Sequence, residues 1–360
     1  MAAVTRHEGP VAVTGASGFI GAHVVSALMK RGYELRACVT DLENEEKTRV
    51  LEAINKDSPG RLTLHEANLL ESGSYDAVFA GCSAVMHLGT PMAYGAKITP
   101  TQVYEGSITG TRNVLESVAR AGSVARVIYT SSFAAVAHPA RPGYVFTEAD
   151  WATDNRAEDP NWNMDDIDNK GDTGYAMAKV ECEEFACEFA ETDGRFDVVS
   201  ICPSAVLGPL LSPLHELVGS WQYYLGRMLE GEPCGRSWKS LWNCVDVRDV
   251  AEAQALALES RVCRNRSRYL LTATDRSYEL SAAELQAHLQ ALFPHIEVGG
   301  PSPAYDEMIQ RDGAPFDGPR AYCDKARGEL GLTTHALADT LRSTGETLIA
   351  LGLVTPKRRS

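Results

Sequence analysis

A tyrosine and a lysine near the middle of the chain have the spacing of a proton-transfer pair. Tyr175 and Lys179 are four residues apart in the segment YAMAK, so one turn of a helix would place both side chains on the same face. A tyrosine hydroxyl ordinarily has a pKa of about 10, and a neighbouring ammonium group lowers that pKa. We therefore predict that Tyr175 acts as a general acid or base with Lys179 beside it.

Two serines could supply a hydroxyl group to the same place. Ser131 and Ser132 directly follow the apolar run of residues 126–130, which is typical of a buried strand. If Tyr175 opens the next helix, the carboxyl end of this strand brings a serine hydroxyl into the same crevice. A tyrosine and a lysine at this spacing also arise by chance, so their position after a serine-ending strand is what favours a functional interpretation.

A glycine-rich turn near the N-terminus could bind a dinucleotide. Residues 11–21 read VAVTGASGFIG, a short apolar run that breaks into three glycines before an apolar helical pattern begins. Glycine permits a tight turn and the close approach of a pyrophosphate, and the following helix presents free N–H groups to phosphate. We expect the nucleotide to contact six residues of this turn, namely Gly15, Ser17, Gly18, Phe19, Ile20 and Gly21.

Strands and helices alternate along the first half of the chain and must position these residues. The apolar patterns predict strands at 33–40, 62–65, 84–88, 126–130 and 196–202 and helices at 44–54, 101–121 and 175–191. Such alternation predicts an α/β fold with a doubly wound parallel sheet, whose ligand lies at the carboxyl ends of the strands.

The chain is long enough for a second, smaller lobe. At 360 residues it exceeds the usual size of one compact core. We expect residues 1–202 to form the dinucleotide-binding domain, with a loop excursion at 138–174 that is rich in proline, aspartate, asparagine and tryptophan. Residues 203–360 should form mainly a substrate-binding lobe, with segments around 240–260 returning to the first domain.

Composition excludes several classes of function. A formal net charge of −14 argues against nucleic acid or an anionic membrane as the main partner. Nine cysteines without a Cys-x-x-Cys pair indicate neither a disulfide framework nor a metal site. No apolar run reaches the length of a membrane span, and residues 1–9 lack a signal-peptide core. We therefore expect a cytoplasmic protein.

Taken together, the motifs resemble those of the extended short-chain dehydrogenases/reductases, in the branch of dihydroflavonol reductases, cinnamoyl-CoA reductases and aldehyde (carbonyl) reductases. The similar segments include VTGASGFIGAHVV, RAGSVARVIYTSS, YAMAK, CPSAVLGP, NCVDVRDVAEA and LGLTTHALADTLRSTGETLIALGLV. The resemblance implies a Rossmann-type fold. It also implies that Ser132 hydrogen-bonds the substrate carbonyl, that Tyr175 donates the proton as hydride arrives from the nicotinamide, and that Lys179 holds the ribose and lowers the tyrosine pKa. Ser131 is the neighbouring candidate, expected to be turned away.

The same resemblance implies further cofactor contacts. Plant relatives clamp the 2′-phosphate of NADP with an arginine, and Thr40 stands in its place here. Lys47 matches a second basic residue that serves this phosphate. Relatives that use NAD tend to have an acidic residue at the position of Val39, where it would repel the 2′-phosphate. We therefore expect NADP, with NAD as the alternative. The remaining implied contacts are Asn68 and Leu69 for the adenine, Leu88, Gly89 and Thr90 beside the ribose and pyrophosphate, and Pro203, Ser204, Ala205 and Val206 for the carboxamide.

The substrate class is predicted only broadly. Ala137 replaces the asparagine of dihydroflavonol reductases, and the cinnamoyl-CoA reductase signature around Tyr175 is absent, so neither activity is transferred. We expect an apolar or aromatic ketone or aldehyde interconverted with its alcohol, with the insert at 139–174 shaping the pocket. The aromatic residues of the second lobe could line that pocket or pack the lobe; they are Trp221, Tyr223, Tyr224, Trp238 and Trp242.

Other interpretations stay open at this point. An epimerase or dehydratase of the same superfamily would use the same three catalytic residues but retain NAD, and a dinucleotide sensor without activity would be expected to lose Tyr175 and Lys179. A monomer and a homodimer are both compatible with the sequence. His87 is expected to be a hydrogen-bonded core histidine, and Asp249 to cap a helix at 250–258.

Overall fold

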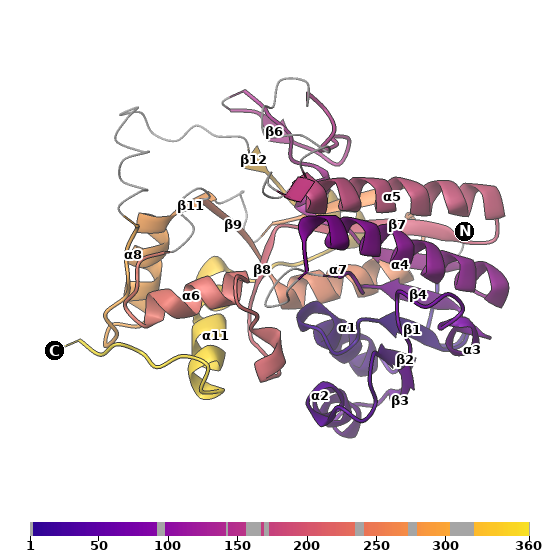
Figure 1. Ribbon diagram of the computed structural model, residues 1–360, viewed down its shortest axis with the longest axis horizontal. Coiled ribbons are helices and arrows are strands. Elements are labelled where there is room, and N and C mark those ends of the chain that lie inside the picture. The colour runs from indigo at the N-terminus through magenta and orange to yellow at the C-terminus, as the bar shows by residue number, and fades with distance from the viewer. Residues whose placement is uncertain are drawn as a thin grey trace.

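A seven-stranded parallel sheet forms the centre of the larger domain in the computed structural model (Figure 1). The structure describes residues 3–91, 98–141, 143–155, 167–168, 173–234, 241–272, 279–302 and 320–359. The strand order is β10-β7-β5-β4-β1-β2-β3. The bounds are β1 Val11–Thr14, β2 Glu34–Val39, β3 Arg61–Glu66, β4 Ala84–His87, β5 Arg126–Thr130, β7 Asp197–Pro203 and β10 Ser267–Leu271.

Helices cover both faces of this sheet. The long pair α4 and α5 lies side by side on one face together with α3, whereas α1, α2, α7 and α10 pack on the other (Figure 1). Their bounds are α1 Phe19–Lys30, α2 Glu45–Lys56, α3 Asp76–Phe79, α4 Pro100–Ala121, α5 Thr173–Asp193, α7 Val247–Glu259 and α10 Asp324–Leu330. Because the strands are covered on both sides, β1, β4, β5 and β7 are buried along their whole length.

The order of the strands reverses at β1. This strand pairs with β2 on one side and with β4 on the other, so successive crossovers run in opposite directions from it. A doubly wound sheet places its ligand-binding crevice at such a switch point, outside the carboxyl ends of the strands. The fold predicted from the alternating pattern is therefore confirmed, and the strand that ends at Thr130 has the predicted bounds.

A smaller lobe has its own sheet and apolar core. The sheet has the order β11-β9-β8, with bounds β8 Ala205–Leu207, β9 Leu241–Asp246 and β11 Glu279–Ser281. In the described part of the chain, this lobe also contains the helices α6 Trp221–Leu229, α8 Ala282–Leu292 and α11 Leu337–Ala350. Figure 1 shows these helices gathered at the end of the molecule opposite α2 and α3. Leu225, Leu285 and Leu341 are fully buried where the three helices meet.

The return to the larger domain is longer than the sequence indicated. The predicted return around 240–260 contains β9, which belongs to the small-lobe sheet, and α7, which packs on the large sheet. The return continues past residue 260, because β10 adds the edge strand beside β7 and α10 packs against α7 and β10. Within the excursion, β6 (Val145–Phe146) pairs with β12 (Arg320–Ala321).

One predicted helix cap is wrong. Asp249 lies inside α7, whereas the residue that caps this helix is Asp246, whose carboxylate accepts a hydrogen bond from the N–H of Arg248 at 2.8 Å. The helix begins three residues earlier than the pattern indicated because β9 runs into it without a loop. The buried Asp249 instead accepts a hydrogen bond from the backbone N–H of His335 at 2.9 Å. Among the described residues, no helix has the length and the apolar composition needed to cross a membrane.

Candidate active site

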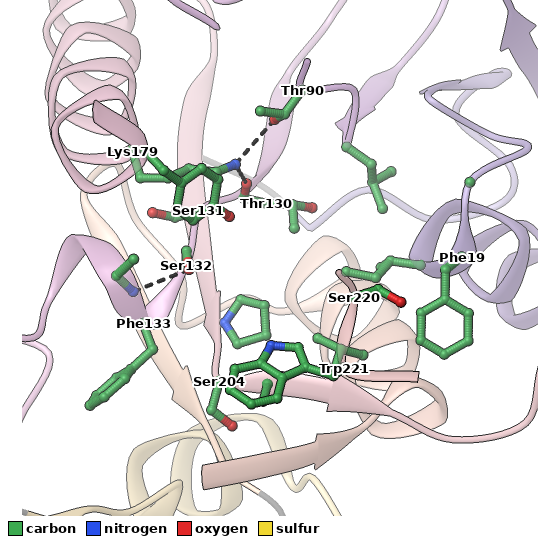
Figure 2. A pocket seen from close by; sticks show the side chains of 18 of the residues that line it. Phe19, Thr90, Thr130, Ser131, Ser132, Phe133, Lys179, Ser204, Ser220 and Trp221 are labelled. Carbon is green, nitrogen blue, oxygen red and sulfur yellow. Dashed lines mark hydrogen bonds between the residues drawn. The ribbon is translucent and has the colours of Figure 1, made fainter. Parts of the chain in front are cut away.

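A cavity of about 650 Å³ opens at the carboxyl ends of the central strands, between the two lobes. Figure 2 shows Lys179, Ser131 and Ser132 on one side of this cavity and Trp221 and Ser204 on the other. The larger domain contributes Gly15, Gly18, Phe19, Ile20, Gly21, Leu88, Gly89, Thr90, Thr130, Ser131, Ser132, Phe133, Ala134, Ala137, Tyr175, Lys179 and Pro203. The segment from Ser204 onward contributes Ser204, Ala205, Val206, His215, Leu217, Ser220, Trp221, Gln222 and Asn243.

The glycine turn between β1 and α1 forms the floor of one end of the cavity. Gly15 has a φ of +63°, and an added Cβ there would lie 3.0 Å from the backbone of Gly89. A Cβ at Gly21 would overlap the carbonyl oxygen of Gly15, so a side chain at either position would force the turn apart. Thr14 fixes the neighbouring loop, because its hydroxyl accepts hydrogen bonds from the N–H groups of Leu88 and Gly89, each at 3.1 Å.

Lys179 is buried on the cavity wall. Its Nζ donates to the carbonyl oxygen of Thr130 at 2.9 Å and to the hydroxyl of Thr90 at 3.1 Å (Figure 2). It lies 5.7 Å from the centre of the Tyr175 ring, so the two residues share one face of α5 as their spacing predicts. Burial disfavours the charged amine and lowers the pKa of Lys179 to about 8. A lysine with this pKa is still largely charged at neutral pH.

The two serines after β5 have different surroundings. Ser131 is buried, and its hydroxyl donates to the carboxylate of Glu183 at 2.6 Å. The half-buried Ser132 lies next to the cavity, where its Oγ accepts a hydrogen bond from the N–H of Ala134 at 3.1 Å. Only Ser131 is therefore held by a buried carboxylate, and this geometry favours Ser132 as the residue that meets a substrate.

The predicted cofactor residues fall into two groups. All the predicted residues of the glycine turn except Ser17 line the cavity. The cavity is also lined by Leu88, Gly89, Thr90 and the four residues from Pro203 to Val206. Thr40 and Lys47 lie outside its wall but contact each other, since the Lys47 Nζ donates to the Thr40 hydroxyl at 2.6 Å. Asn68 and Leu69 are also outside the wall; the carbonyl of Leu69 accepts a hydrogen bond from Asn113 at 2.8 Å.

Several cavity residues were missed by the sequence analysis. Asn243 is a polar one: its buried side-chain amide has no hydrogen-bond partner in the structure, so it is available to a ligand. The same holds for the hydroxyl of Ser204, which the sequence did predict. The sequence carries no signal for Asn243, because nothing in a strand of the second lobe indicates which cavity it faces. Phe133 and Ala134, directly after Ser132, add a short apolar wall.

The aromatic residues of the second lobe separate by role. Trp221 lines the cavity and also packs against the core of the small lobe, whereas Tyr224 packs against that core outside the cavity wall. Trp238 and the side chain of Trp242 lie outside the described residues. His87 is buried, with Nδ1 2.9 Å from the Thr14 hydroxyl, and burial lowers its pKa to about 3. It is therefore a neutral core histidine, as expected.

The comparisons with known proteins agree with this architecture. Residues 11–269 match the NAD dependent epimerase/dehydratase family. Cinnamoyl-CoA reductase 1 of Oryza sativa subsp. japonica is 32% identical over 335 residues, which cover 92% of this chain and 88% of the relative. Tetraketide alpha-pyrone reductase 1 of Arabidopsis thaliana is 30% identical over 310 residues, which cover 86% of this chain and 88% of the relative.

Solved structures show the same fold. Gre2 of Candida albicans in complex with NADPH superimposes with a TM-score of 0.77 at 23% identity, over 95% of this chain and 99% of that one. Vestitone reductase of alfalfa superimposes with a TM-score of 0.71 at 22% identity, over 96% of this chain and all of the other (100%). The resemblance predicted from the motifs is thereby confirmed: the chain belongs to the NAD dependent epimerase/dehydratase family of extended short-chain dehydrogenases/reductases.

Proposed function

We propose that this protein is an NADPH-dependent reductase that interconverts a ketone or aldehyde with the corresponding alcohol. The observation that carries the proposal is that Ser132, Tyr175 and Lys179 line the same cavity as the glycine turn. A proton donor and a dinucleotide cradle within one cavity are what carbonyl reduction requires. Relatives that span most of the chain are named as reductases, which supports the same activity.

The residues present fit a dinucleotide. The turn at Gly15 and Gly21 leaves no room for a side chain, so the backbone itself can approach a pyrophosphate at the start of α1. We infer NADPH rather than NADH because Lys47, held against Thr40, offers a cation to the 2′-phosphate. The fungal structure solved with NADPH supports this choice. When bound, NADPH supplies the hydride.

The chain's own residues then handle the carbonyl oxygen and its proton. The Ser132 hydroxyl donates a hydrogen bond to that oxygen and orients the substrate. Tyr175 delivers the proton from its hydroxyl to the oxygen as the alcohol forms, and in the reverse direction it accepts this proton. The Lys179 ammonium, 5.7 Å from the Tyr175 ring, stabilises the tyrosinate that remains.

The substrate is an apolar or aromatic carbonyl compound in this proposal. Phe133, Leu217 and Trp221 give the cavity apolar surface, and Asn243 adds an unpartnered amide that could bind a polar group of the substrate. The excursion at 139–174 is proposed to shape the pocket. Exchanging it for the corresponding segment of a relative should change substrate preference and leave the affinity for NADPH nearly unchanged.

The first experiment measures oxidation of NADPH and of NADH against a panel of aromatic and aliphatic aldehydes, ketones and diketones. Turnover that is lost in Tyr175→Phe is the expected result. Turnover that survives this substitution would show that Tyr175 is not the acid.

The family is named for epimerases and dehydratases, and the same experiment tests this alternative activity. An epimerase or dehydratase would show no net oxidation of either cofactor, and nucleotide would stay bound through purification. This outcome would replace the reductase proposal.

A further inference from the structure

A buried carboxylate connects the serine turn to the edge strand of the sheet. Glu183, on α5, accepts a hydrogen bond from the Ser131 hydroxyl at 2.6 Å through one oxygen. Its other oxygen accepts from the Arg268 Nε at 2.7 Å. Glu183 is fully buried, and Arg268 is 5% exposed. A buried ion pair is costly to desolvate, so its position beside the proposed active site calls for a role beyond stability.

Arg268 extends this connection to the excursion after the active-site strand. Its Nη1 donates to the carbonyl oxygens of Glu148 at 2.9 Å and Asp150 at 2.8 Å, and its guanidinium stacks 3.7 Å from the centre of the Trp151 ring. The next residue, Ala152, donates its N–H to the carbonyl of Ala135 at 2.9 Å. The turn that holds Ser131 and Ser132 is thus anchored at two points, at Ser131 by Glu183 and at Ala135 by Ala152.

Glu183 also lies one helical turn beyond Lys179 on α5, on the same face. Titratable or aromatic groups that face the Lys179 ammonium come from four elements: His87 on β4, Tyr129 on β5, Cys202 on β7, and Tyr175, Cys182 and Glu183 on α5. Burial keeps His87 neutral and raises the pKa of both cysteine thiols, so Glu183 supplies the carboxylate among these groups. Its charge stabilises the protonated form of Lys179.

We propose that Glu183 is a positioning residue for carbonyl reduction, which holds the serine turn through Ser131 and sets the charge state of the Tyr175–Lys179 pair, with Arg268 fixing its orientation. This inference rests on the proposed function. It predicts two separable effects of Glu183, one mechanical and one electrostatic.

The electrostatic effect is tested with Glu183→Gln, which keeps the shape of the side chain and removes its charge. Loss of a nearby negative charge lowers the pKa of both Lys179 and Tyr175. Since reduction requires protonated Tyr175, the alkaline limb of the kcat profile should move to lower pH by roughly one unit. An unchanged limb would overturn the electrostatic part of the proposal.

The matched control is the second buried ion pair of the same sheet. Asp197 accepts hydrogen bonds from Arg126 at 2.7 and 2.8 Å where β5 and β7 begin, at the edge opposite the cavity. Both side chains are as buried as Glu183 and Arg268. Asp197→Asn should therefore destabilise the protein to a similar degree and leave the pH profile in place. An equal shift in both variants would mean that the shift reports only loosened packing.

The mechanical effect is tested with Ser131→Ala, which keeps the ion pair intact and is expected to fold even if Glu183→Gln does not. It should lower kcat by about tenfold, with the KM for NADPH unchanged and the pH profile unmoved. The amide oxygen introduced by Glu183→Gln can still accept the hydrogen bond from Ser131, so the two losses in kcat should multiply in the double variant if the effects are separate. A kcat within twofold of the natural protein for Ser131→Ala, or a double variant no slower than Glu183→Gln alone, would overturn this part.

A readout that needs no turnover separates this inference from the proposed function. Tyrosinate absorbance, taken as the difference between each protein and its Tyr175→Phe version, follows the ionisation of Tyr175 without substrate. The Glu183→Gln protein should ionise at lower pH than the natural one. If the natural protein reduces no carbonyl but this shift is present, the proposed function fails and the coupling stands. If the natural protein reduces a carbonyl but the shift is absent, the proposed function stands and the coupling fails.

Discussion

The Nζ atom of Lys179 lies 5.7 Å from the centre of the Tyr175 ring and donates a hydrogen bond to the carbonyl oxygen of Thr130, the last residue of β5. The ammonium is thereby fixed between the tyrosine and the strand that carries the serines. Because the ammonium is buried, its effect on Tyr175 is not screened by solvent.

Replacing the lysine should separate proton transfer from binding. Lys179→Met removes the charge that favours the tyrosinate, so the pKa of Tyr175 should rise and kcat should fall by about 10²-fold or more. The pKa of Lys179 is about 8, so in the natural protein the lysine loses its charge as the pH rises through that value. Steady-state kinetics across pH test this prediction, and a variant with the natural pH profile would contradict it.

Cofactor preference should depend on Lys47. Lys47→Ala removes the cation that contacts Thr40, so the KM for NADPH should rise by about tenfold while the KM for NADH stays constant. The control is Arg49→Ala, on the exposed side of the same helix, where Arg49 pairs with Glu45. If both substitutions change the ratio between cofactors equally, general surface charge and not Lys47 is responsible.

The glycine turn should not tolerate a methyl group. Gly21→Ala places a Cβ against the carbonyl oxygen of Gly15, which should lower the free energy of unfolding by about 1–3 kcal/mol and abolish NADPH binding. Gly328→Ala, in α10, meets nothing within 4 Å and should instead raise stability by about 0.5–1 kcal/mol. Chemical denaturation and NADPH fluorescence measure the two effects. Normal NADPH affinity in Gly21→Ala would contradict the cradle.

Selectivity for aromatic substrates should depend on Trp221. Trp221→Ala removes apolar surface from the cavity wall, so kcat/KM should fall about tenfold or more for aromatic aldehydes and much less for small aliphatic ones. Tyr223→Ala removes an aromatic ring from the same helix outside the cavity wall and should leave this ratio unchanged. A uniform loss for all substrates in Trp221→Ala would indicate a packing role instead.

Acid should destabilise the protein before its carboxylates titrate. Burial lowers the pKa of His23 and His215 to about 4 and that of His87 to about 3, from 6.5. The unfolded chain therefore binds more protons below pH 6.5, so stability present above that pH is lost as the pH falls toward 4. Each histidine contributes a slope of up to about 1.4 kcal/mol per pH unit.

Urea denaturation across this pH range measures the slope, and His23→Gln should reduce it by roughly a third. The glutamine amide can still donate to the carbonyl of Pro209, the partner of the His23 Nε2 at 2.9 Å. An unchanged slope would show that His23 does not titrate as its burial implies.

Much of the fold could be predicted because the central strands are local apolar runs. The strand before Ser131 is buried on both faces, so its sequence alone marks its bounds. The edge strand β10 could not be found in this way, since it carries the buried Arg268, whose burial depends on Glu183 in a distant part of the chain. The pairing of β6 with β12 is likewise set by tertiary packing.

The candidate site also contains residues of both kinds, those whose proximity follows from the local sequence and those that tertiary packing brings together. Tyr175 and Lys179 are neighbours on one helix, so their proximity follows from spacing. Asn243 reaches the cavity only because the small lobe folds over it, which no local pattern encodes. Glu183 looks like an ordinary helix carboxylate in the sequence, and its burial is visible only when β10 is in place.

The position of Ser204 has a consequence for ligand release. This residue alone separates β7, in the sheet of the large domain, from β8, in the sheet of the small lobe, and it also lines the cavity. Any rotation of one lobe relative to the other would have to change the backbone torsions around Ser204 at this connection. Opening of the cleft would therefore deform the wall of the cavity, so the lobes could not separate without a loss of ligand contacts.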